Sequence, residues 1–148
     1  MTALRIAALL TVFAVSTAAH AQPAAAGRGT PPQPRPMDKI FPLGASWIAV
    51  SLNGKPFTGD RPSFSIDQRL RATGFGGCRN FTTVAYPLRE QGLAVGPFEL
   101  TRKSCSKEVM AREEAFLVAL RTTAKWEQQG STLVLRSPNG ELRFERAL

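Results

Sequence analysis

Hydrophobic residues come in short blocks, or alternate with polar ones, along most of the chain after residue 45, a pattern typical of β-strands. The block at residues 46–52 (SWIAVSL) predicts a strand, and Asn53-Gly54 directly after it predicts a tight hairpin turn. Phe64 and Ile66 alternate with polar neighbours, which predicts a half-buried strand. Further strands are predicted at residues 81–88, 93–100, 133–135 and 142–144, and Trp126 is expected to begin another.

After Ser106, the apolar residues are spaced as in an α-helix. Ser106 is a suitable N-cap residue for this helix. Apolar side chains follow it at Val109, Met110, Phe116, Leu117 and Leu120. We expect Gly74-Phe75-Gly76-Gly77 to be a tight turn rather than a phosphate-binding loop, and residues 137–140 (SPNG) to form a type I turn ending in a glycine bulge. The predicted fold class is α+β: a mainly antiparallel, barrel-like β-sheet with one α-helix packed near the C-terminal hairpin.

The first 21 residues have the pattern of a secretory signal peptide. Arg5 precedes an apolar stretch from Ile6 to Ala19, and Ala19-His20-Ala21 fits the small-x-small cleavage pattern. The alternative is a membrane anchor, but the stretch is shorter than the roughly 18 residues that span a bilayer. No cysteine for lipid attachment lies near the cleavage site, and no later segment is long and apolar enough to span a membrane. We therefore expect a periplasmic or secreted protein.

The rest of the chain divides into two parts. Residues 22–36 are rich in Pro, Ala and Gly and predict a linker, so the folded domain is expected at residues 37–148. The only histidine, His20, lies within the signal sequence, which excludes histidine-based triads and metal sites from the mature protein. Glu113 and Glu114 are adjacent on the predicted helix and cannot form a facing acid–base pair. We expect them on a solvated helix face, with a buried contact of Glu113 as the open alternative.

Two cysteines, Cys78 and Cys105, occur in the chain. An even number in an oxidising compartment favours a disulfide, which would stabilise the domain by about 3–4 kcal/mol in the chain-entropy model. The alternative is a reactive thiol, for which a nearby Arg or Lys would have to lower the pKa because no histidine remains. Two cysteines without histidine make a poor zinc site, so we expect no metal and no cofactor.

The formal net charge of the whole chain is +8, and it is unevenly distributed. Residues 38–68 and 108–148 are each neutral, whereas residues 69–107 hold seven cations against two glutamates. A disulfide would draw four of these cations toward one neighbourhood: Arg79, Arg102, Lys103 and Lys107. They could bind an anion, such as a lipid phosphate or an acidic envelope protein. The alternative is a solvated basic surface. Nucleic acid is not an expected partner, because the protein is expected to be exported and no recognised nucleic-acid motif is present.

Several of these pieces together resemble the META domain, also called HslJ-like. They are Trp47 with Asn53-Gly54, the Gly76–Phe81 motif (GGCRNF), the Thr101–Cys105 motif (TRKSC), the helical segment Glu113–Leu120, and the closing hairpin at residues 133–135 and 142–144. The resemblance covers the chain from about Trp47 to Arg146. The sequence departs from the family pattern at Arg79, where asparagine is usual, and at Lys103, where methionine is usual.

The resemblance implies a small, β-rich envelope or secreted domain without established catalysis. Relatives are linked to heat induction, to resistance to certain antibiotics and, in parasites, to virulence or secretion. Many are lipoproteins. The function that we expect is therefore an exported, non-catalytic domain with an envelope-stress or binding role, directed toward an anionic lipid or an envelope protein. The alternatives are a thiol-dependent redox protein and a secreted protease inhibitor.

Overall fold

The structure is a computed structural model, and it describes residues 39–148. The expected signal peptide at residues 1–21 and the expected linker at residues 22–36 lie outside the described residues. Within residues 39–148, no helix is long and apolar enough to cross a membrane.

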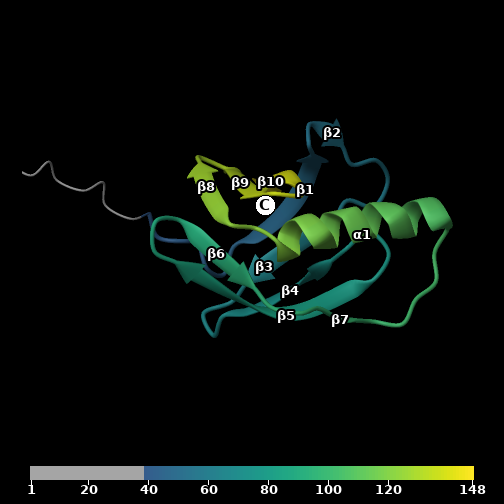
Figure 1. The fold of residues 1–148 in the computed structure, drawn as a ribbon, viewed down its shortest axis with the longest axis horizontal. Coiled ribbons are helices and arrows are strands. Elements are labelled where there is room, and N and C mark those ends of the chain that lie inside the picture. The colour runs from purple at the N-terminus through teal and green to yellow at the C-terminus, as the bar shows by residue number, and fades with distance from the viewer. Residues whose placement is uncertain (1–38) are drawn as a thin grey trace, which may run out of the picture. The chain divides into compact units, whose positions relative to one another are not determined.

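The described part of the chain folds into ten strands and one helix (Figure 1). The strands are β1 (Ser46–Leu52), β2 (Lys55–Pro56), β3 (Ser63–Ile66), β4 (Arg71–Phe75), β5 (Asn80–Leu88), β6 (Gly92–Val95), β7 (Glu99–Leu100), β8 (Lys125–Gln129), β9 (Thr132–Ser137) and β10 (Gly140–Arg146). The helix α1 (Lys107–Arg121) lies between β7 and β8 in the sequence.

All strands join one antiparallel sheet that closes into a ring. Its order is β10-β9-β8-β6-β5-β4-β3-β1-β2, and β10 also pairs with β1. The shortest strand pairing in the ring is that of β6 with β8, which pair only at Gly92 and Lys125. The antiparallel α+β class and the single helix that the sequence predicts are confirmed, and the helix packs against β6, β9 and β10.

Aromatic side chains fill the space between the sheet and the helix. Trp47 and Ala49 of β1 point inward and are fully buried, as the alternating pattern of that strand requires. Phe116 of α1 is also fully buried, and its ring centroid lies 6.2 Å from that of Phe144 on β10 and 6.3 Å from that of Phe81 on β5. The helix therefore covers one side of the ring of strands, and Phe116 extends from it into the core between β5 and β10.

The local signals for the first hairpin and for the start of the helix are confirmed. Asn53 and Gly54 both have positive φ angles, 52° and 75°, and they join β1 to β2. This is the backbone that an Asn-Gly hairpin turn requires. Ser106 has extended backbone angles, and its side-chain oxygen accepts a hydrogen bond from the Val109 N–H at 3.4 Å.

The structure corrects the prediction that residues 74–77 are a turn throughout. Gly74 and Phe75 belong to β4, and only Gly76 and Gly77 lie in the turn. A Cβ atom on Gly74 would lie 2.1 Å from the Ser63 carbonyl oxygen and 2.5 Å from the ring of Phe81. Gly74 is therefore required by the close approach of neighbouring strands and not by a turn.

The predicted strand at residues 93–100 is also corrected. It is interrupted at Gly96–Phe98, so β6 and β7 are separate strands that both pair with β5. Pro97 has no N–H to give to a sheet, and the Gly96 N–H donates to the Val84 carbonyl at 2.8 Å. This interruption leaves Phe98 beside α1, where it forms part of the site described next.

Candidate functional site

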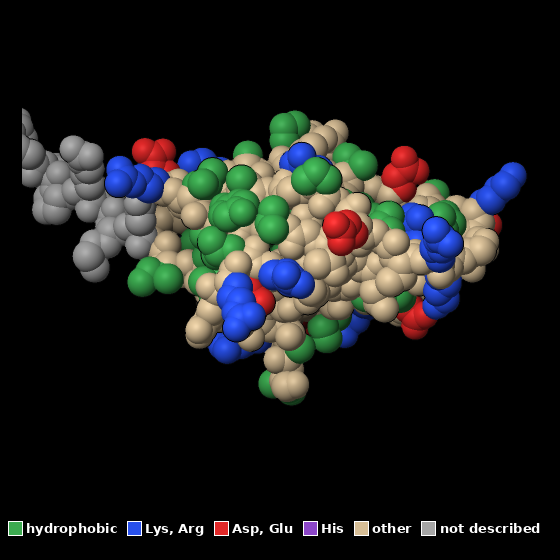
Figure 2. All heavy atoms as spheres, turned by 90° about the horizontal axis from the view of Figure 1, so that it is seen from below, with side chains coloured by type: hydrophobic (Ala, Val, Ile, Leu, Met, Phe, Trp, Pro, Cys, Tyr) green, Lys and Arg blue, Asp and Glu red, His purple; other side chains and the backbone are tan. Residues whose placement is uncertain are grey.

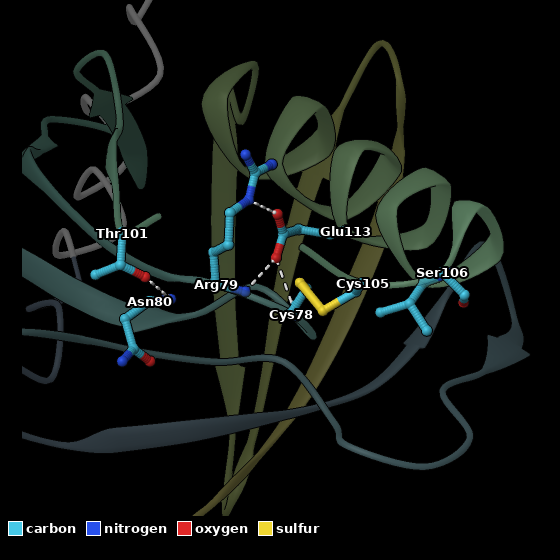
Figure 3. Close-up of a disulfide and its surroundings, with 8 residues drawn as sticks. Cys78, Arg79, Asn80, Thr101, Cys105, Ser106 and Glu113 are labelled. Atoms are coloured by element: carbon cyan, nitrogen blue, oxygen red, sulfur yellow. Dashed lines mark hydrogen bonds and ion pairs between the residues drawn. A yellow bond between two sulfur atoms is a disulfide. The ribbon is translucent and has the colours of Figure 1, made fainter. Parts of the chain in front are cut away.

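Cys78 and Cys105 form the disulfide that the sequence predicts. Their Cα atoms lie 6.2 Å apart, and no free cysteine occurs among residues 39–148. The disulfide ties the loop between β4 and β5 to the segment that leads into α1 (Figure 3). Both thiols are thus consumed, and the reactive-thiol alternative would first require reduction of this bond.

Glu113 makes a second connection between the same loop and α1. One of its carboxylate oxygens, Oε2, accepts hydrogen bonds from the backbone N–H groups of Cys78 at 2.9 Å and of Arg79 at 2.6 Å. The other, Oε1, accepts from Arg79 Nε at 2.6 Å, which is also an ion pair. The expectation of a solvated face is therefore wrong for Glu113, which is fully buried, whereas Glu114 is exposed.

Gly76 makes room for this carboxylate. A Cβ atom at position 76 would lie 2.7 Å from Glu113 Cγ, closer than real Cβ atoms come to another heavy atom. The loop amides of Cys78 and Arg79 are therefore occupied by a carboxylate of the chain itself and are not available to an external anion. This agrees with a structural turn and not with a phosphate-binding loop.

A groove of about 650 Å³ runs along α1, next to the disulfide. Apolar side chains from the helix and from the β6–β7 region supply most of its surface: Phe98, Leu100, Met110, Leu117 and Val118. The charged residues that line it are Arg79, Lys107, Glu114 and Arg121. This volume is within the range of small-molecule sites, and the combination of an apolar surface with a few charged groups is typical of them.

The structure does not gather all four predicted anion-binding residues in one place. Arg79 and Lys107 line the groove, but Lys103 lines a second hollow of about 360 Å³, and Arg102 lines neither. Cys105 borders both hollows, so the disulfide lies between them. The second hollow also contains Arg112, whose guanidinium donates to Thr58 Oγ1 at 3.0 Å.

Arg79 and Arg121 are both held in position at the groove. Arg79 has only 23% of its side chain exposed, and Glu113 balances its charge. Arg121 donates a hydrogen bond from a terminal nitrogen to the Val95 carbonyl oxygen. Arg121 was not among the site residues predicted from the sequence. The available signal was its position fourteen residues after Lys107, which places both on one side of a helix.

The residues that the structure describes include no group of three or more His, Cys, Asp or Glu side chains placed to hold a metal ion.

β5 carries a separate exposed apolar patch on its outer face, formed by Val84, Tyr86 and Leu88. Figure 2 shows hydrophobic side chains gathered on the side of the molecule where β5 and β6 lie in Figure 1, with Lys and Arg side chains around them. The groove along α1 and this patch on β5 are thus separate apolar surfaces.

A closed antiparallel sheet, one covering helix and a disulfide beside the helix start define a small disulfide-bonded α+β domain. The chain belongs to the META domain family, whose model matches residues 41–147. A search of curated proteins found no match.

Two solved structures share the fold. One, determined by NMR, is 20% identical, with a TM-score of 0.60, and covers 72% of this chain and 95% of its own. The other, an NMR structure of a protein from Burkholderia xenovorans, is 20% identical, with a TM-score of 0.57, and covers 78% of this chain and 98% of its own. At this identity the similarity shows the fold alone.

Proposed function

We propose that this META domain is exported to the periplasm or the cell exterior and binds an anionic component of the cell envelope, in a role that supports the envelope under stress. It acts without catalysis. The export proposal rests on the signal pattern of residues 1–21 and agrees with a disulfide, a bond that persists mainly in oxidising compartments.

The observation that carries the binding proposal is the cationic surface beside the disulfide. Arg102, Lys103 and Lys107 are exposed within six residues of one another, on the segment that leads into α1. No acidic residue lies between them. Exposed cations on a short segment attract an anionic lipid surface, with each Lys or Arg contributing about 1 kcal/mol near the membrane.

The absence of catalysis is supported by how the reactive groups are used. Glu113 is the buried carboxylate of the described residues, and three hydrogen bonds engage its two oxygens. A carboxylate held in this way is not free to accept a proton from a substrate. Both cysteines are joined in the disulfide, so neither is a nucleophile in this state.

Sedimentation with lipid vesicles at low salt tests the binding proposal. The protein should sediment with vesicles that contain phosphatidylglycerol and not with vesicles of phosphatidylcholine alone. The double reversal Arg102→Glu with Lys103→Glu should weaken this association by at least about tenfold, because it replaces two exposed cations of this segment by carboxylates.

The matched control is Lys55→Glu with Arg146→Glu. Both residues are exposed and line neither the groove nor the second hollow, and the double variant has the same net charge as the test variant. Equal sedimentation with both types of vesicle would overturn the proposal. Equal weakening by the two double variants would show a response to net charge and would overturn the assignment to this surface.

A further inference from the structure

The groove along α1 is built on one continuous stripe of the helix. Lys107, Met110, Glu114, Leu117 and Arg121 follow one another at spacings of three or four residues, and all line the groove. At about 1.5 Å per residue, this stripe is about 20 Å long. The groove is therefore elongated, with Lys107 and Arg121 at its ends and Glu114 between the apolar Met110 and Leu117.

The apolar part of the groove combines exposed side chains with the buried Leu117. Val118 lies near the C-terminal end of α1, and 41% of it is exposed. Leu100 of β7 is exposed on the opposite wall, and Phe98 is only partly buried against the core. Contiguous exposed apolar side chains in a concave surface mark a binding site more often than isolated ones do.

The charged groups favour an anion at the N-terminal half of the helix. Arg79 donates to Glu113 through Nε. In the described part of the chain, no group is hydrogen-bonded to the two terminal nitrogens of Arg79, which point away from Glu113 in Figure 3. Arg79 thus offers oriented donors, while Glu113 offsets its charge. Lys107 and Arg121 together exceed Glu114 by one positive charge, so the groove has a net positive charge.

Resting on the proposed function, we propose that the groove binds a single-chain anionic amphiphile. Its acyl chain lies on Phe98, Leu117 and Val118. Its anionic head group accepts hydrogen bonds from Arg79 and is attracted by Lys107. A guanidinium that is already held in place loses little freedom when it binds, which favours such a site. The elongated apolar surface and the net positive charge together select this ligand over a cationic or a compact one.

Isothermal titration calorimetry with dodecanoate, below the concentration at which it forms micelles, tests this proposal on the exported form of the protein, without the signal sequence of residues 1–21. Dodecanoate should saturate a single site. Hexanoate, which has the same head group and a shorter chain, should bind at least about tenfold more weakly, because less apolar surface is buried. Dodecyltrimethylammonium, which has the same chain and a positive head group, should not saturate the site.

Val118→Glu should weaken dodecanoate binding by at least about tenfold, because it places a carboxylate where the chain would lie. The matched control is Val84→Glu, at a residue that is 44% exposed in the apolar patch of β5 outside the groove. It should leave the affinity unchanged to within about twofold. Circular dichroism spectra that match the wild type establish that both variants fold.

A second pair of variants changes the charge of the groove. Glu114→Gln should tighten dodecanoate binding by about threefold, since it removes the carboxylate that lines the groove. Glu108→Gln, on the same helix but outside the groove, should leave the affinity unchanged.

The results separate this inference from the proposed function. If the protein sediments with phosphatidylglycerol vesicles but dodecanoate does not saturate, or Val118→Glu and Val84→Glu behave alike, the acyl-chain site is overturned and the anionic surface stands. If dodecanoate saturates and the vesicle test fails, the ligand is a monomeric amphiphile and the envelope surface is not the partner. If neither binds, both proposals are wrong.

Discussion

Two clusters of Arg and Glu side chains in this molecule use the same residue types in opposite surroundings. At the loop–helix junction, formed by Gly76–Arg79 and Glu113, a fully buried carboxylate accepts two backbone N–H groups and one guanidinium N–H. All three contacts join segments that lie more than thirty residues apart. Each hydrogen bond there replaces water that the buried carboxylate has lost.

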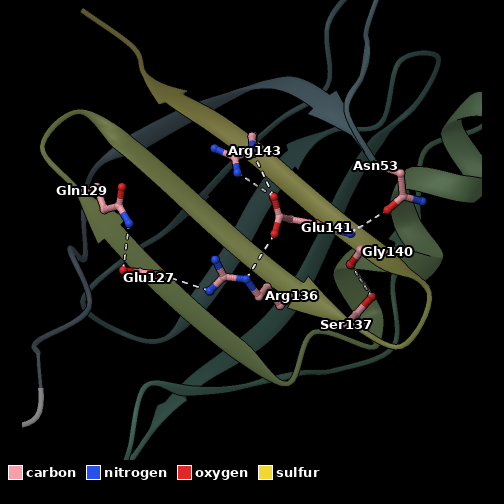
Figure 4. A network of polar contacts seen from close by, with 8 residues as sticks. All are labelled: Asn53, Glu127, Gln129, Arg136, Ser137, Gly140, Glu141 and Arg143. Carbon is pink, nitrogen blue, oxygen red and sulfur yellow. Dashed lines mark hydrogen bonds and ion pairs between the residues drawn. The ribbon is translucent and has the colours of Figure 1, made fainter.

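The second cluster lies on the outer surface of β8, β9 and β10 (Figure 4). Arg136 bonds Glu127 and Glu141, each at 3.1 Å, and Arg143 bonds Glu141 at 2.9 Å. About a third to a half of each of these side chains is exposed. The partners of Arg136 belong to neighbouring strands that backbone hydrogen bonds already join, and Arg143 and Glu141 belong to the same strand.

The comparison shows that the number of ion pairs does not indicate where the fold depends on charge. The surface network has three ion pairs, yet solvent and mobile ions weaken each of them. The loop–helix junction has one, but loss of its carboxylate would leave a buried amide, a partly buried amide and a guanidinium without their acceptor. We therefore expect the junction to control stability and the network to contribute little.

The two largest predicted effects lie at the loop–helix junction, and the first is that of Glu113→Gln. The substitution keeps the shape of the side chain but removes its charge and places an amide NH2 where an acceptor is needed. We expect the free energy of unfolding to fall by about 3 kcal/mol, as for other buried pairs that lose one partner. Urea denaturation without reductant measures this, so that the disulfide stays intact.

Glu127→Gln is the matched control in the surface network, and its urea midpoint should stay close to that of the wild type. A loss of stability in Glu127→Gln as large as that in Glu113→Gln would remove the distinction between the two clusters.

The next effect is that of the disulfide, the other bond between the loop and α1. Replacing both Cys78 and Cys105 by alanine should lower the free energy of unfolding by about 3 kcal/mol, because the unfolded chain is no longer constrained by the closed loop. A reductant should produce a similar loss in the wild type and no further loss in the double variant. A wild-type urea midpoint that does not respond to the reductant would contradict this prediction.

The sequence predicts well what depends on neighbouring residues. Asn53-Gly54 gives the first hairpin because both residues accept positive φ angles, and Ser106 begins the helix because its side chain bonds the N–H three residues later. The contacts of Glu113 could not be predicted in this way, because they depend on a loop that lies 34 and 35 residues earlier. The adjacent glutamates look alike in the sequence, and only the packing of α1 on the ring separates them.

The candidate site divides along the same line. The helical stripe from Lys107 to Arg121 can be predicted from the spacing of its residues in the sequence, but the opposite wall of the groove cannot. Phe98 and Leu100 lie at this wall because the strand is interrupted at Pro97 and β7 then pairs with β5 again. The predicted strand at residues 93–100 concealed that break, so the groove emerged only from the tertiary structure.

The smallest predicted effect lies in the surface network and concerns pH. The pKa of Glu127 is held below its usual value, first by the hydrogen bond from the Gln129 side chain and then by the hydrogen bond from Arg136. Because the carboxylate form is favoured in the folded state, its contribution to stability is present above the pKa of the unfolded chain and is lost as the pH falls through the folded value. Exposure keeps this contribution small.

Gln129→Ala and Arg136→Gln should therefore each raise the pKa of Glu127 toward its usual value. The side-chain carboxyl resonance of Glu127, followed by NMR through an acid titration, measures both changes. A larger change in Arg136→Gln would show that the guanidinium, and not the amide hydrogen bond, holds the proton off. An unchanged pKa in both variants would show that the network of Figure 4 does not persist in solution, which would place still more of the electrostatic stability of the domain at the loop–helix junction.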